Sequence, residues 1–379
     1  MMPPIDPHGL SAMPAPYWFV QFFKALGFTL HMVPMNLWYA GLLLAMVLHL
    51  CGSEHGRRFS GRLMTQMPVL VALGINFGIV PLLFVQVAYY KAFYSATILT
   101  AWFWLAIVGL LIPAYYGVYA YALGLRNEQA GLASWRKAAG WGAAMLFILI
   151  GFLFANGWSL MTNVGAWSRL WENHSVGGAT LGTALNVADR TFWPRWLLMF
   201  GLALMTTAAW LVVDAAWFAR KENETYRQWA SSFAWKLHTA GAIWFAAAGS
   251  WYVFGAWQAG LRASMSTGWL HVLMIATALA PGLPWILMAL GRKQAPRRAT
   301  ALGIALAQLG VLAVNATSRQ VVQNLELKAY LDVAAIREEV QVSPLILFLA
   351  VFVAGLGVIG WVIAQAVKAS ATEPGQSGV

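Results

Sequence analysis

Long apolar runs bounded by charged residues recur from one end of this 379-residue chain to the other. A hydrocarbon core about 30 Å thick takes about 20 apolar residues for each helical crossing. The eighth run is the shortest, with about 18 residues before Ser318, which is near the lower limit for a crossing. The runs predict an all-α, polytopic membrane bundle of about nine transmembrane helices, at about 24–50, 67–90, 95–123, 138–162, 195–219, 230–257, 266–290, 299–316 and 343–367.

The composition leaves little room for anything but membrane helices. The chain is 60% hydrophobic and 10% charged, against about 25% charged in soluble domains, which excludes a large water-soluble catalytic domain. A single cysteine, Cys51, excludes an internal disulfide, a Cys-x-x-Cys-His haem attachment and a four-cysteine iron–sulfur site. We expect an N-terminal periplasmic tail over 1–17, a transmembrane domain over 18–369 and a disordered cytoplasmic tail over 370–379.

The net charge of +11 fits membrane topology better than nucleic-acid binding. Of the 24 Lys and Arg residues, 15 fall on the side that holds the connection after the first run and the C-terminus. Because basic residues accumulate on the cytoplasmic face, we expect a bacterial inner-membrane protein with a periplasmic N-terminus and a cytoplasmic C-terminus. The longer connections 163–194 and 317–342 would then face the periplasm, as a surface for a partner protein or as ordinary solvated loops.

Histidines inside the apolar runs are the main candidates for chemistry, because ionisable groups at membrane depth are costly and so are functional candidates. His31 in the first run and His271 in the seventh lie at similar depth near the outer side. Two neutral imidazoles from separate helices can hold one haem iron, so we predict His31 and His271 as an axial pair. His238 and His49, nearer the inner side, are further candidates. For each, the alternative is an imidazole bonded to a neighbouring carbonyl or to water.

One acidic residue, Asp214, lies well inside a predicted run. A buried carboxylate either relays a proton or pairs with a nearby cation. We expect Asp214 to pair with Arg220.

Four fragments resemble subunit I of the cytochrome bd quinol oxidases. The resemblance implies a nine-helix bundle with a haem ligand at His31, a cofactor contact at Arg319 and quinone as a reaction partner. The fragments are His31 with Pro34 and Gly41–Met46, then Gly74–Gly78, then Phe154–Trp158 with Asn163–Gly165, and finally Ser318–Gln320.

The chain also departs from that family's pattern. Leu198 stands nearest the position of the low-spin haem histidine, and Ala316 stands where a carboxylate haem ligand is expected. The third run lacks paired glutamates, and the quinol-binding loop is cut to about 258–265. These losses argue against a working oxidase.

We therefore expect a subunit of a respiratory electron-transfer complex that carries b-type haem. It would pass electrons between the quinone pool and a periplasmic c-type cytochrome docked on the two outer connections. One alternative is a haem-free membrane anchor for partner cytochromes. Another is a divergent bd-type quinol oxidase with unfamiliar ligands.

Overall fold

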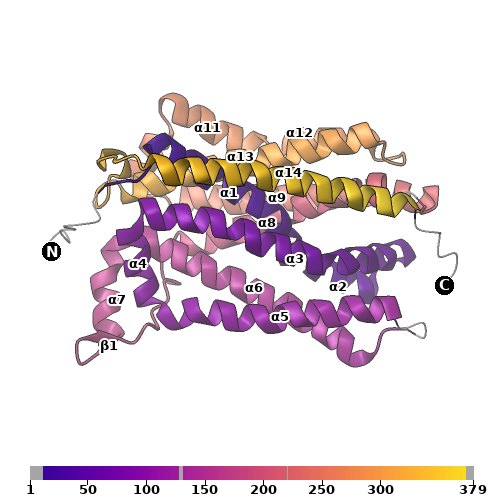
Figure 1. The fold of residues 1–379 in the computed structure, drawn as a ribbon, viewed down its shortest axis with the longest axis horizontal. Helices are drawn as coiled ribbons and strands as arrows, with labels where there is room; N and C mark the ends of the chain where they lie inside the picture. Colours follow the sequence, from indigo (N-terminus) through magenta and orange to yellow (C-terminus); the bar gives the residue numbers. More distant parts are fainter. Residues whose placement is uncertain (1–11, 128–130, 220, 373–379) are drawn as a thin grey trace.

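A computed structural model describes residues 12–127, 131–219 and 221–372. The chain is a single bundle of long helices running side by side (Figure 1). The long segments are α1 (Tyr17–Asn36), η1 (Leu37–Gly41) and α2 (Leu42–Cys51) in one rod, α3 (Glu54–Ala88), α5 (Ala101–Asn127), α6 (Ser134–Thr162), α8 (Phe192–Val213) with η3 (Asp214–Phe218), α9 (Glu224–Ser250) with η4 (Trp251–Ala256), α11 (Gly268–Leu279) with α12 (Gly282–Gly291), α13 (Arg298–Leu327) and α14 (Val342–Thr372).

Short elements connect these rods. At the left end of the bundle in Figure 1 lie α4, α7 and β1. The hairpin of β1 and β2 is antiparallel and pairs Ser175 with Thr180. The connecting elements are α4 (Tyr90–Leu99), η2 (Val164–Ala166), α7 (Trp167–Asn173), β1 (Ser175–Val176), β2 (Ala179–Thr180), α10 (Ala259–Met265) and η5 (Val333–Ala335).

The predicted all-α membrane bundle is confirmed. Eight helical segments in the described part of the chain are long and apolar enough to cross a membrane. The ninth expected crossing is α9, which has 27 residues and packs along α8 but is more polar. The first helix begins, and the last helix ends, at opposite ends of the bundle (Figure 1), which we call the N-side and the C-side.

Several predicted helix boundaries were wrong. The eighth crossing runs to Leu327 instead of ending at 316, because polar side chains in its last turns find partners inside the bundle. The second crossing begins at Glu54, where the Ser53 side chain accepts a hydrogen bond from Gly56 N at 3.2 Å. The third predicted run is divided at Thr100 into α4 and α5.

The segment before α1 is tied to the connection before α14. Met13 N donates to Arg337 O at 2.7 Å, and Glu339 N donates to Met13 O at 2.9 Å. Met13 is buried. The predicted tails over 1–17 and 370–379 therefore lie only partly outside the described residues, since residues 12–16 pack on the bundle and α14 continues to Thr372.

A buried ion pair joins α3 to η3 on the C-side. Asp214 accepts hydrogen bonds from Arg62 Nε at 2.7 Å and Nη2 at 2.9 Å, and from Gln66 Nε2 at 2.7 Å. Arg62 also lies 3.6 Å from Glu222. The expected partner Arg220 lies outside the described residues, and both Asp214 oxygens are occupied by side chains of α3. The pair thus clasps α3 to the end of α8.

Replacing Asp214 by alanine should destabilise the bundle by about 3 kcal/mol, because the largely buried Arg62 would lose its bidentate carboxylate and keep only the more distant Glu222. Thermal unfolding in detergent or nanodiscs measures the loss. Glu339→Ala is the control, since it removes an exposed ion pair with Arg337, worth at most about 1 kcal/mol. Equal unfolding temperatures for the two variants would contradict a stabilising role of the ion pair between Asp214 and Arg62.

Candidate functional site

The ring of His31 on α1 faces α3, and one of its ring nitrogens is hydrogen-bonded to the α3 backbone. Its Nδ1 is 2.8 Å from the carbonyl oxygen of Gly74. Because a carbonyl can only accept, Nδ1 carries the proton and the lone pair is on Nε2. A carbonyl that fixes the tautomer in this way is the usual outer-shell partner of a metal-binding histidine.

Two glycines one turn apart on α3 make room for the ring of His31 in α1 and the ring of Trp38 in η1. A Cβ at Gly78 would lie 2.9 Å from His31 Cε1, and a Cβ at Gly74 would lie 2.2 Å from the Trp38 ring. Both distances are shorter than side chains tolerate. The Gly74–Gly78 fragment therefore has a steric function, which is to let α3 approach the rings of His31 and Trp38.

Arg319 extends from α13 toward the same place. Its guanidinium lies over the Phe28 ring, 4.6 Å from the centroid, and Phe28 in turn contacts the His31 ring, with centroids 6.4 Å apart. Arg319 is within electrostatic range of both His31 and Lys24. Within the described ranges Arg319 has no carboxylate partner and no hydrogen bond, so its charge is available to an anionic group.

A second cation, Lys24, is buried on α1 one turn before Phe28, on the N-side of it. Its ammonium donates to the amide oxygen of Gln320 and, at 3.2 Å, to that of Gln323, and it lies over the Tyr89 ring at 4.6 Å from the centroid. Gln320 and Asn324 continue this cluster by bonding to Tyr89 and Gln21. Lys24 is the first residue of the first predicted run, yet it shares one helix face with Phe28 and His31, at spacings of four and three residues.

The other predicted histidines lie elsewhere. His271 is exposed in the first turn of α11, and no hydrogen bond or ring contact joins it to His31 among the described residues. His49 is half-buried at the C-side end of α2, with its ring 6.0 Å from that of Tyr121. His238 is fully buried in α9 beside Gln308. In the part of the chain that the structure describes, no group of three or more His, Cys, Asp or Glu side chains is placed to hold a metal ion.

The two positions at which the resemblance expects haem ligands, Leu198 and Ala316, pack against apolar side chains. Ala316 is buried among apolar side chains that include Met32, and Leu198 packs against the same cluster. Nearby Arg195 is paired with Glu326 and donates to the Tyr252 hydroxyl at 2.6 Å. Neither Leu198 nor Ala316 carries a ligand atom for iron.

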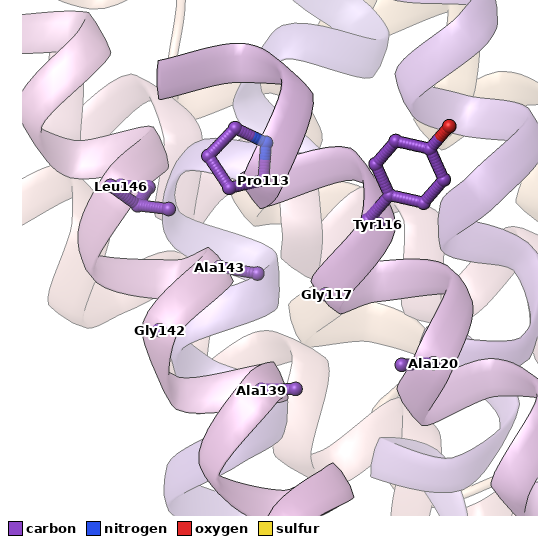
Figure 2. A pocket seen from close by; sticks show the side chains of 8 residues that line it. All are labelled: Pro113, Tyr116, Gly117, Ala120, Ala139, Gly142, Ala143 and Leu146. Atoms are coloured by element: carbon purple, nitrogen blue, oxygen red, sulfur yellow. The ribbon is translucent and has the colours of Figure 1, made fainter. Parts of the chain in front are cut away.

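A hollow of about 370 Å³ lies away from these residues, between α5 and α6. Figure 2 shows its lining, in which small side chains and Pro113 leave an apolar surface and Tyr116 stands at one edge. None of its lining residues is a predicted site residue. We therefore assign the candidate site to His31 and Arg319.

Comparison with known proteins supports the fold. A chain from the structure of bd oxidase from Geobacillus thermodenitrificans superposes with a TM-score of 0.63 over 94% of this chain and 99% of that one, at 14% sequence identity. No model of a protein family matches the sequence, and no curated protein matches it either. The predicted likeness to the bd oxidases is thus confirmed as a shared fold between distant sequences.

Gly78→Ala should destabilise the protein by about 1–3 kcal/mol, because the new methyl group would force the His31 ring from its place against α3. Thermal unfolding measures the effect. Gly61→Ala on the same helix is the matched control, since a Cβ there meets nothing within 4 Å and should be neutral or stabilise by about 0.5–1 kcal/mol. A Gly78→Ala protein as stable as the Gly61→Ala protein would contradict the close packing.

Proposed function

We propose that this multi-pass membrane protein is the membrane subunit of a respiratory electron-transfer complex in the bacterial inner membrane. In this proposal His31 holds a b-type haem, and electrons pass between the quinone pool and a periplasmic c-type cytochrome. The N-side would face the periplasm. The observation that carries the proposal is the Gly74 carbonyl bond to His31 Nδ1, which leaves Nε2 as the lone-pair nitrogen.

The residues around His31 suit a haem in their chemistry. A haem is an apolar plane with two carboxylate groups, and it supplies one-electron redox chemistry at its iron when bound. Phe28 and Trp38 place aromatic rings beside His31, and Arg319 offers a guanidinium that no carboxylate of the described residues neutralises. His31 would provide the axial nitrogen, while Arg319 would bind a carboxylate and fix the orientation of the plane.

The other predicted ligands contribute less to this proposal. We keep two predictions that no contact favours. One is His271 as the second axial ligand, and the other is His238 and His49 as further haem contacts. A site with one histidine is sufficient for our proposal. Quinone as reaction partner rests on the resemblance in sequence motifs and fold to a bd oxidase.

An absorption spectrum of the purified protein tests the proposal. We expect a reduced α-band that disappears in His31→Ala, and haem affinity that falls by roughly tenfold in Arg319→Gln, the scale for outer-shell partners. His271→Ala is the matched control, because His271 is exposed and its loss should leave the band intact. A haem-free wild-type protein, or an unchanged spectrum in His31→Ala, would refute the assignment.

A haem-free membrane anchor is the second candidate function. It is favoured by the apolar packing of Leu198 and Ala316 at positions where the resemblance expects ligands. This candidate requires a protein without iron that still folds and binds partner cytochromes. Metal analysis of the purified protein separates the two functions.

A further inference from the structure

Four polar side chains from four different helices meet deep inside the bundle. They are Asn36 of α1, Thr206 of α8, His238 of α9 and Gln308 of α13. Hydrogen bonds join Asn36 to Thr206 and Thr206 to Gln308, and His238 lies beside Gln308. Their exposed fractions are only 0%, 4%, 0% and 3%. The predicted haem site does not use this cluster.

Thr206 fixes the orientation of both amide groups. Its hydroxyl oxygen accepts from Asn36 Nδ2 at 2.9 Å and from Gln308 Nε2 at 3.2 Å, while the hydroxyl donates to the Leu202 carbonyl at 2.9 Å. A hydroxyl has one donor and two acceptor positions, so Thr206 is saturated. The carbonyl oxygens of Asn36 and Gln308 must therefore find donors elsewhere.

Four buried atoms of the cluster are without a hydrogen bond among the described residues. They are Asn36 Oδ1, Gln308 Oε1 and both ring nitrogens of His238. A direct bond from His238 to the neighbouring Gln308 oxygen would satisfy one nitrogen and one oxygen, and would leave the other nitrogen and Asn36 Oδ1 unpaired. Unpaired polar atoms are especially costly in a membrane, where no bulk solvent can bond to them.

We propose that this cluster is an internal water-binding site. One water molecule can donate to Asn36 Oδ1 and to Gln308 Oε1 and can accept from the N–H of His238, which gives it the three partners that buried waters usually have. A cation fits poorly because none of the four side chains of the cluster carries a negative charge to offset its desolvation. His238 is then a water-binding residue that ties α9 to the other three helices.

The water site accounts for one polar residue of α9, the buried His238. The buried face of α9 carries His238 and Ser231 along with small residues. A polar helix is retained in a membrane when its polar groups face the protein interior and are paired there. With a bound water molecule, the buried His238 side chain has a hydrogen-bond partner inside the protein.

Hydroxyl-radical labelling tests the site in the full-length protein in lipid nanodiscs. X-ray irradiation makes radicals from bound water, so a buried side chain is modified when it touches a water molecule. His238 should be labelled several-fold faster than Phe245, after correction for intrinsic reactivity. Phe245 is the matched control because it is buried on the same helix, with apolar neighbours.

The variant Gln308→Leu removes one acceptor of the water and keeps a side chain of similar size. Labelling of His238 should then fall to the level of Phe245. Labelling of wild-type His238 no faster than that of Phe245, or labelling unchanged in Gln308→Leu, would overturn the proposal. If Gln308→Leu does not fold, a cryo-EM map of the wild-type protein decides between a water peak at the cluster and a dry His238. Neither readout depends on haem.

Discussion

Polar groups in a membrane must find their partners inside the protein, and α1 and α13 meet this requirement together. Near the N-side, the amide side chains of Gln320, Gln323 and Asn324 on α13 bond to Gln21 and Lys24 on α1. In the middle of the bundle, Asn36 of α1 and Gln308 of α13 both bond to Thr206 of α8. Because these polar groups bind only where a neighbouring helix supplies a partner, the bonds fix the register of α1 and α13. They thereby set the positions of His31 and Arg319.

Eight of the nine predicted crossings correspond to helices of the described residues that are long and apolar enough to span a membrane. They could be read from the sequence because a crossing requires a sufficient length of apolar residues. The residue at which α13 ends could not be predicted in this way. Residues from Arg319 to Asn324 read as a polar loop, since hydropathy scores each side chain as if it faced lipid. In the structure Gln320 and Asn324 face Gln21 and Tyr89, so helix and polarity are compatible. The partner of Asp214 was not predicted because Arg62 is 152 positions away in the sequence.

The candidate site was only partly predictable. His31 and Arg319 were found through motif resemblance, and the structure adds that Phe28 connects them. The role of the Gly74–Gly78 fragment needed the packing of α3 on α1, which sequence spacing does not reveal. Lys24 could have been found from its place on the His31 face of α1, but its neutral partners, Gln320 and Gln323, come from almost 300 positions later in the chain.

These distant pairings impose an order on biogenesis. The start of α1 is tied to the chain at Arg337 and Glu339, and Lys24 obtains its amide partners only from α13. While a ribosome is still making the middle of the protein, the first helix therefore sits in the translocon or the bilayer with an uncompensated ammonium group. That helix can settle in its final place only after nearly the whole chain has been synthesised. Early helices of this protein must wait for late ones, and a chain terminated before α13 would expose its first crossing to quality control.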